Sequence, residues 1–271
     1  MRLIGEHYAA SPRLFAINVW RYRELLGHLV IRTLKAQYKQ SLLGYSWLLV
    51  NPLVQLLTLT FVFSTLLKTP SQGVPFALFL YAGLLPWLFF SSAVLASSES
   101  VLGAYNLVTS VYFPRELLVV AAVLSRVADL LAGSVIFVAL LLYHGYMPDA
   151  SIVWLPLVFA LQMLFTIGLG LPVAALNLFF HDVRFLVGVG LNLWFFVTPV
   201  MYPPDVVPDR YRLLYDLNPL ARFIASYRGY AFAGESPDPE NLLVGAAMAV
   251  AMLVIGFYLF KRLEPHFADR I

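Results

Sequence analysis

Long apolar runs separated by short polar breaks dominate the chain. Six of these runs approach or exceed the roughly 20 residues that a helix needs to cross the hydrocarbon core of a bilayer. They cover residues 47–67, 75–96, 117–143, 152–180, 185–201 and 242–260. The pattern predicts an all-α polytopic protein with six transmembrane helices, built as a single membrane domain over residues 1–271. We divide that domain into an interfacial segment (1–45), spans 1 to 5 (46–201), an external segment (202–240), span 6 (241–260) and a tail (261–271).

A helical period of apolar and basic positions runs from residue 25 to residue 40. The apolar face contains Leu26, Val30, Leu34 and Tyr38. The basic face contains His28, Arg32, Lys35 and Lys39. This pattern is typical of an amphipathic interface helix that lies among the headgroups of an anionic leaflet, with membrane lipids as its partner. The alternative is a helix that packs on the cytoplasmic side of the protein itself.

The external segment at residues 202–240 contains six prolines and alternates aromatic with apolar pieces. Its candidate gate residues are Tyr202, Tyr211, Tyr215 and Tyr227. Non-helical backbone near a membrane is tolerated where protein or a water-filled cavity surrounds it. We therefore expect two short re-entrant helices that dip toward the outer leaflet before the last span; the alternative is an ordinary surface loop.

Composition strengthens the membrane prediction. Hydrophobic residues form 61% of 271 positions, charged residues form 12%, and the mean hydropathy is +0.79. These values exclude a soluble domain with a polar surface. The chain has no cysteine, so it has no disulfide framework, thiolate nucleophile or cysteine-built metal site. Its net charge of +3 comes with no nucleic-acid recognition motif, so we expect no nucleic-acid partner.

The distribution of Lys and Arg predicts the orientation. Twelve of these residues fall in the N-terminal segment, the second and fourth loops and the tail, whereas five fall in the other three loops. Cytoplasmic loops of membrane proteins carry the excess of basic residues. We therefore expect both termini on the cytoplasmic side.

Two charges lie within or near the third run. Arg126 and Asp129 are three residues apart and so share a helix face, where charge is costly. A mutual ion pair is one interpretation, and a polar patch on a translocation path is the other. Aromatic residues form 15% of the chain, and most should belong to interface belts or packing. A minority should line a path on which sugar rings stack; the candidates are Tyr45, Trp47, Trp87, Phe90, Trp194 and Phe196.

Residues 98–116 form a polar-to-mixed break between the second and third runs, and we interpret them as a docking device. Pro114 should end a short helix over residues 104–112, because proline lacks the amide donor and clashes with the preceding turn. No phosphate-binding G-x-x-x-x-G-K-[ST] motif occurs in the chain, which therefore cannot hydrolyse ATP by that route. His181 and Asp182 on a short turn make a poor metal site, so we expect neither metal nor cofactor on this chain.

Five motifs carry a family resemblance. They are Leu43-Gly44-Tyr45-Ser46-Trp47 with Asn51-Pro52, Gly83-Leu84-Leu85-Pro86-Trp87, Asn177-Leu178-Phe179-Phe180-His181-Asp182-Val183-Arg184, Phe196-Val197-Thr198-Pro199-Val200-Met201-Tyr202 and Leu217-Asn218-Pro219-Leu220. In this order and spacing, and over nearly the whole chain, they make the sequence similar to the ABC-2 type permeases that export lipid-linked polysaccharides.

The resemblance implies a homodimer of six-span subunits in the inner (plasma) membrane. It implies a transporter subunit without enzymatic activity, two copies of a separate ATPase that binds ATP and Mg, and a polyprenyl-linked polysaccharide substrate, above all O-antigen. Residues 25–40 match the interface helix and 202–240 the external gate helices. Residues 104–114 match the coupling helix that contacts the ATPase, with candidate residues Asn106, Leu107, Val111, Tyr112, Phe113 and Pro114. The chain departs from the family in its second cytoplasmic loop, where Arg115 is the single basic residue.

Other functions fit the same spans. One is an ABC-2 exporter of a drug or small lipid, which a short outer loop without gate helices would favour. Another is a membrane-embedded glycosyltransferase or polymerase acting on a polyprenyl-linked sugar. Such an enzyme needs paired carboxylates that face one cavity, and the sequence shows none. The third alternative is a protein that acts purely as a scaffold for such an enzyme complex.

Overall fold

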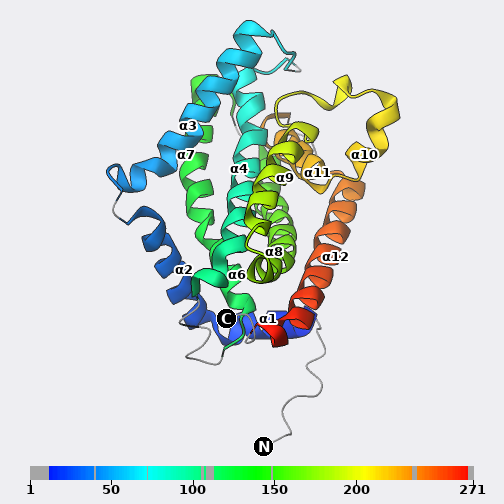
Figure 1. The fold of residues 1–271 in the computed structure, drawn as a ribbon. Helices are drawn as coiled ribbons and strands as arrows, with labels where there is room; N and C mark the ends of the chain where they lie inside the picture. Colours follow the sequence, from blue (N-terminus) through cyan, green and yellow to red (C-terminus); the bar gives the residue numbers. More distant parts are fainter. Residues whose placement is uncertain are drawn as a thin grey trace, which may run out of the picture.

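The computed structural model describes residues 12–39, 41–71, 73–104, 107, 113–147, 149–233 and 237–267. Helices form most of this part of the chain, and it contains no β-strand. The long helices run side by side, and helix α1 (Pro12–Arg21) crosses one end of the bundle (Figure 1). We call this the α1 end. The opposite end, near which the short helix α10 (Arg212–Asp216) projects, is the α10 end.

Five helical stretches are long and apolar enough to cross a membrane. They are Gly44–Leu66, Phe76–Ser100, Glu116–Tyr143, Ala150–Phe179 and Pro239–His266. Their main helices are α3 (Trp47–Thr60), α4 (Phe76–Ser100), α6 (Glu116–Ser125) joined to α7 (Val127–Tyr143), α8 (Leu155–Phe179) and α12 (Pro239–Leu263). The predicted all-α membrane architecture is thereby confirmed.

The fifth predicted span is shorter than expected. Helix α9 covers Val183–Val197, 15 residues. At 1.5 Å per residue it is about 22 Å long, less than the roughly 30 Å hydrocarbon core. Thr198 is extended, with ψ of 138°, because a following proline disfavours the helical region. The Thr198-Pro199 pair therefore ends the helix before residue 201, where the apolar run itself stops.

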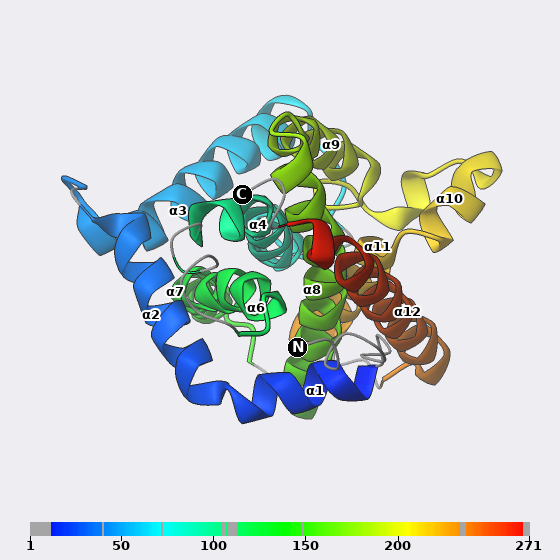
Figure 2. The ribbon, with the colours of Figure 1, turned by 60° about the horizontal axis from the view of Figure 1, so that its bottom comes forward.

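Two helices, not one, precede the first span. The prediction placed a single helix at residues 25–40, but α1 already begins at Pro12, and a break at Tyr22 separates it from α2 (Arg23–Tyr38). Figure 2 shows the two helices joined at an angle, with α2 beside α6 and α7 and α1 extending past the end of α8 toward α12. Leu26 and Leu29 of α2 are buried, and α2 packs on α6. The basic residues Arg32, Lys35 and Lys39 remain exposed. One face of α2 thus packs on the protein, as the alternative interpretation proposed.

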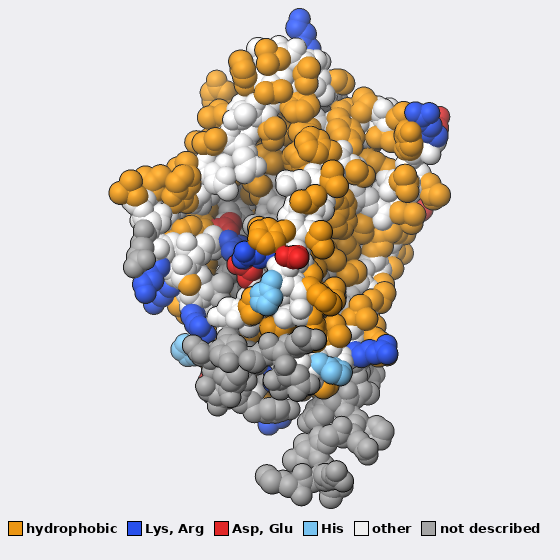
Figure 3. Space-filling view, in the orientation of Figure 1, with side chains coloured by type: hydrophobic (Ala, Val, Ile, Leu, Met, Phe, Trp, Pro, Cys, Tyr) orange, Lys and Arg blue, Asp and Glu red, His pale blue; other side chains and the backbone are white. Residues whose placement is uncertain are grey.

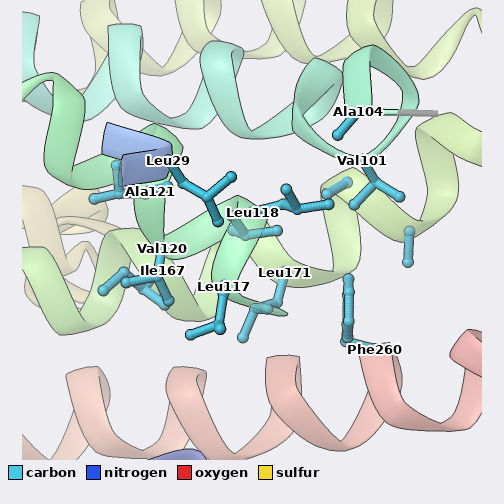
Figure 4. Close-up of a cluster of buried hydrophobic side chains, with 14 of the residues drawn as sticks. Leu29, Val101, Ala104, Leu117, Leu118, Val120, Ala121, Ile167, Leu171 and Phe260 are labelled. Carbon is cyan, nitrogen blue, oxygen red and sulfur yellow. The ribbon is translucent and has the colours of Figure 1, made fainter. Parts of the chain in front are cut away.

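Helix α4 is the central helix of the bundle. In its 18-residue apolar stretch, 72% of the residues are buried inside the protein, whereas the corresponding share in the first span is 11%. It packs on α3, α6, α7, α8, α9 and α11 (Pro219–Arg228). Toward the α1 end, residues from α2, α6, α8 and α12 form one apolar cluster, in which Leu29, Leu118 and Phe260 are visible in Figure 4. The first, third and fourth spans pack around α4, whereas α12 packs mainly on α8; their outer faces expose the apolar side chains that lipid requires.

The segment between α9 and α12 contains the two short helices that the sequence predicted. Helix α10 projects from the bundle and carries exposed leucines, Leu213 and Leu214. Helix α11 is different, because it packs against α4, α8 and α12 and most of its residues are buried. The Asn218 side chain caps it by accepting a hydrogen bond from the Leu220 amide, and Pro219 occupies its first turn. The surface-loop alternative therefore fails for α11.

Candidate functional site

A cavity of about 730 Å³ lies between α2, α3, α4, α7 and α9. Half of the residues that line it are polar. These are Gln37, Tyr38, Ser41, Asn51, Gln55, Ser91, Ser92, Arg126, Asp129 and Asn192. Polar groups on membrane spans normally face a bundle interior or a water-filled space, because lipid offers them no hydrogen bonds. In Figure 3, acidic and basic side chains lie close together within an otherwise mostly apolar face.

The charges of the cavity sit at a helix break. Arg126 separates α6 from α7, and its amide donates to the carbonyl of Val123, one residue closer than in a regular α-helix. Its Nη1 lies 3.5 Å from Oδ2 of Asp129, so the predicted ion pair is present. Both side chains are mostly buried, with 19% and 24% of their surfaces exposed. Whether they lie on a translocation path stays a prediction.

Tyr38 joins this pair to α2. Its hydroxyl donates to Oδ1 of Asp129 at 2.6 Å and accepts from Nε2 of Gln37 at 2.6 Å. Burial, followed by the neighbouring Asp129 carboxylate, raises the pKa of the Tyr38 phenol. The hydroxyl therefore stays protonated at neutral pH and remains a donor. Through it, the helix before the first span is fixed to the third span.

The aromatic candidates for the substrate path fall into three groups. Trp47 lines the cavity. Tyr45 packs on Tyr38, with ring centroids 5.2 Å apart, and Phe196 is exposed on α9. Trp87 and Phe90 are buried in the core, where the Phe90 ring meets that of Trp194 at 5.3 Å. These last three rings pack on one another instead of facing the cavity, and a role for any aromatic residue in transport stays a prediction.

We call residues 104–114, the predicted ATPase contact, the docking stretch; its described residues lie at the α1 end. Asn106, Val111 and Tyr112 fall outside the described residues. Leu107 packs against the apolar cluster there, and Phe113 is buried in it with 5% of its surface exposed. Pro114 leads directly into α6. Phe113 therefore anchors the stretch to the chain's own core, which the sequence did not indicate.

A buried ionic network lies beside this stretch, and sequence reasoning missed it. The Glu116 carboxylate is fully buried, and it accepts hydrogen bonds from Nδ2 of Asn18 and from Nζ of Lys261, both at 2.8 Å. Lys261 also contacts Glu264 at 2.8 Å. The network ties α1, α6 and the end of α12 together. The signal available in the sequence was an acidic residue at the start of an apolar run and a lysine at the end of another.

Three of the four predicted gate tyrosines gather around one cavity. Tyr202, Tyr211 and Tyr215 line a space of about 460 Å³ between the end of α9 and α10. The Tyr202 hydroxyl donates to the carbonyls of Phe196 and Val197, at 3.0 and 3.2 Å. Tyr227 lies elsewhere, on α11, with its hydroxyl 2.9 Å from Oε1 of Gln162 on α8. The structure thus separates Tyr227 from the other three.

Arg228, at the end of α11, is a second residue that the sequence did not single out. Its side chain is buried, and its guanidinium donates to the carbonyls of Phe79, Pro199 and Val200 at 3.2, 2.8 and 2.7 Å. The guanidinium carbon also lies 3.6 Å from the centroid of the Phe79 ring. Arg228 therefore satisfies the carbonyls that the Thr198-Pro199 break leaves without helical partners, and it fixes α11 to α4.

Acidic and histidine side chains are sparse around the large cavity. Within the described ranges, no three histidine, aspartate or glutamate side chains gather as a metal site would require. The lining of the large cavity contains one carboxylate, that of Asp129, and Arg126 neutralises it. The arrangement therefore combines three features. A polar cavity lies within the membrane bundle, a docking stretch lies at the α1 end, and an aromatic segment lies toward the α10 end.

Comparison with known proteins agrees with this arrangement. The chain is 32% identical to the O-antigen export system permease protein RfbA of Myxococcus xanthus, over 94% of this chain and 98% of the relative. It is 30% identical to the protein of the same name from Klebsiella pneumoniae, over 91% and 94% of the two chains. It is 23% identical to the polysialic acid transport protein KpsM of Escherichia coli, over 87% and 92%.

The family assignment has independent support from a sequence profile. Residues 24–232 match the profile of the ABC-2 type transporter family. The matched region begins in α2 and ends just after α11, so it includes the large cavity and the docking stretch. The chain therefore belongs to the ABC-2 type transporter family and is a multi-pass membrane protein.

Proposed function

We propose that this chain is the membrane permease subunit of an ABC exporter that moves a polysaccharide out of the cytoplasm. The three relatives above are, by name, export or transport proteins for saccharide polymers, and two of them are permeases. One matches almost the whole chain at 32% identity. As a permease, the chain contributes the path and not the hydrolysis of ATP.

The large cavity is the observation that carries the proposal. A sugar polymer exposes hydroxyl groups, and transferring a hydroxyl into hydrocarbon without a hydrogen bond costs about 2–7 kcal/mol. The cavity, of about 730 Å³, presents polar side chains from five helices, α2, α3, α4, α7 and α9, within an otherwise apolar bundle. It supplies the partners that a saccharide needs and that lipid lacks.

The finer proposal concerns the assembly and the substrate. We propose a homodimer with two copies of an ABC ATPase that binds ATP and Mg, in the inner membrane with both termini cytoplasmic. The substrate is a polyprenyl-linked polysaccharide, above all O-antigen, as the names of two relatives suggest. Exposed apolar residues on α3 and α9, among them Leu53, Leu57 and Leu193, flank the cavity and give a second copy a surface to cover.

The docking stretch at residues 104–114 is the proposed ATPase contact. Phe113 is buried and Leu107 packs on the same apolar cluster, so these two described residues of the stretch are attached to the bundle. Motion imposed on it would reach α6 directly through Pro114. The buried Glu116 and Lys261 would carry the same motion to α12.

Deleting the gene for this chain tests the proposal in a strain that makes a surface polysaccharide. Surface polymer should fall to background while polymer accumulates inside the cell. The wild-type chain should restore export together with an active ATPase, and should fail to do so with an ATPase whose catalytic glutamate is glutamine. Unchanged surface polymer would contradict the proposal. Unchanged polymer with lost resistance to a toxic compound would instead favour a drug exporter.

A further inference from the structure

Asn177, near the end of α8, is a fully buried amide that joins the ends of two other helices. Its Nδ2 donates to the carbonyl of Ser98, in the last turn of α4, at 2.8 Å. Its Oδ1 accepts from the backbone amide of Arg184, in the first turn of α9, at 3.0 Å. The last carbonyls and the first amides of a helix have no partner within that helix. Asn177 therefore caps α4 and α9 at the same time.

Helix α9 depends on this remote cap. Asp182 occupies its N-terminal cap position, but the Asp182 side chain makes no capping hydrogen bond to the described backbone. The Arg184 side chain adds a second link to α4, because its Nη1 lies 3.1 Å from Oε1 of Glu99. Ser98 and Glu99 are adjacent, so the backbone and the side chain of Arg184 are linked to the same turn of α4. The last turn of α4 and the first turn of α9 are thereby joined.

Helix α9 is held at its two ends more than along its length. Leu191 is the one buried residue of this helix, and nothing described lies within 4 Å of a Cβ placed on Gly188. At the α10 end, the Asn218 side chain accepts from Nε1 of Trp194 at 3.1 Å and donates to Oγ1 of Thr198 at 3.0 Å. A helix attached in this way can tilt as a whole when one of its ends is displaced.

The docking stretch is connected to this junction through α4. A 3₁₀ turn, Leu102–Ala104, joins α4 to the stretch, and Val101 and Ala104 are buried in the apolar cluster of the α1 end. The connection is therefore packed against the bundle. Helix α9 in turn contributes Asn192 to the lining of the large cavity. A displacement of the docking stretch can thus reach the cavity wall through Asn177, by a route separate from α6.

We propose that Asn177 is a positioning residue that transmits motion from the docking stretch to α9. The proposal rests on the proposed export function, in which an ATPase displaces that stretch. The last turn of α4 and the first turn of α9 stay together throughout the transport cycle, and Asn218 carries the displacement from the far end of α9 to α11. Asn177 does not line the large cavity, and it acts through Arg184.

Breaking the link is the first test. Asn177→Leu has nearly the same size and removes both hydrogen bonds. Its complex with the ATPase should hydrolyse ATP at a nearly normal rate, while surface polymer per assembled complex falls at least about fivefold. Thr166→Val is the matched control, because Thr166 is also fully buried on α8 but donates within that helix, to the carbonyl of Gln162 at 2.7 Å. The control should export normally. Normal export per complex in Asn177→Leu, or an equal loss in both variants, would overturn the proposal.

Locking the link is the second test, and it decides the matter even if Asn177→Leu does not assemble. The natural chain has no cysteine, so Glu99→Cys with Arg184→Cys places a unique pair of thiols at the junction. The two side chains are 59% and 48% exposed, so losing this ion pair should change stability little. After a short bismaleimide joins the thiols, export should stay within about twofold of the untreated double variant, because the two turns do not separate.

Both ways of losing export in the double variant would overturn the proposal. Loss before the reagent is added would assign the link to the ion pair instead of Asn177. Loss after cross-linking would show that the two turns separate during transport. The unaltered chain is assayed in the same strain, so its failure to restore surface polymer would count against the export function, whereas its success would confine the failure to this inference.

Discussion

Arg126 and Asp129 are the residues whose removal should have the clearest effect. Each is about four-fifths buried, so replacing one leaves the charge of the other without its partner and largely shielded from bulk water. Arg126→Leu or Asp129→Leu alone should therefore destabilise the protein more than both changes together. We expect a coupling of about 1–2 kcal/mol in a double-mutant cycle of detergent stability. Additive effects would show that the two charges do not depend on each other.

At the same scale, the sequence predicted the contact between the two charged residues better than it predicted the contacts of the aromatic residues. The spacing of Arg126 and Asp129 was sufficient, because residues three apart on a helix are neighbours whatever surrounds them. Trp87 and Trp194 gave no such local signal. Both sit in apolar runs, and whether a ring faces a cavity or the core depends on helices far away in the sequence. The amides of Asn51 and Gln55 were recognisable as polar residues one turn apart in an apolar run, and they proved more informative about the cavity.

At the scale of elements, the contact between α8 and α12 depends on glycine. A Cβ on Gly168 would lie 2.5 Å from the backbone nitrogen of Leu253, and one on Gly256 would overlap the Gly168 carbonyl. The two backbones touch, as small residues allow in membrane bundles. Gly256→Val should lower stability by about 1–3 kcal/mol, the usual range for overpacking.

Thermal unfolding in detergent measures this loss, and Gly190→Ala is the matched control. Nothing lies within 4 Å of a Cβ on Gly190 in α9, so that change should leave the melting temperature nearly unchanged. Equal melting temperatures for Gly256→Val and the natural chain would mean that α8 and α12 separate easily. The contact would then be a moving joint instead of a fixed one.

The boundaries of helices were predictable where a local sequence signal marks them. The Thr198-Pro199 pair signals the end of α9, and Asn218-Pro219 signals the start of α11. Pro12 marks the start of α1 by a similar signal, but the apolar face of this helix is explained only by tertiary packing, since Phe15 packs on Phe257 of α12 with ring centroids 5.5 Å apart. The break at Tyr22 likewise follows from packing, since no proline or glycine marks it.

At the scale of the whole molecule, the spans followed from hydropathy because membrane helices must satisfy their own backbone hydrogen bonds. Their arrangement around α4 did not follow, since six apolar runs can pack in many orders. The buried Glu116, which joins α1, α6 and α12 through Asn18 and Lys261, depends on that arrangement. This network ties α1, α6 and α12 into one unit at the α1 end, which is also the end of the docking stretch.

The orientation of this unit gives the last prediction. Basic residues concentrate in the segments that the structure places at the α1 end, so this end should face the cytoplasm. Glu24→Cys, at the start of α2, and Arg210→Cys, just before α10, are both at exposed positions. An impermeant maleimide should label Arg210→Cys in intact spheroplasts and Glu24→Cys only after permeabilisation. Leu131→Cys, on the outer face of α7 and 62% exposed, should react in neither case, because lipid covers it and excludes the water that the reagent needs. Labelling of Glu24→Cys in sealed cells would invert the topology and place the docking stretch beyond the reach of a cytoplasmic ATPase.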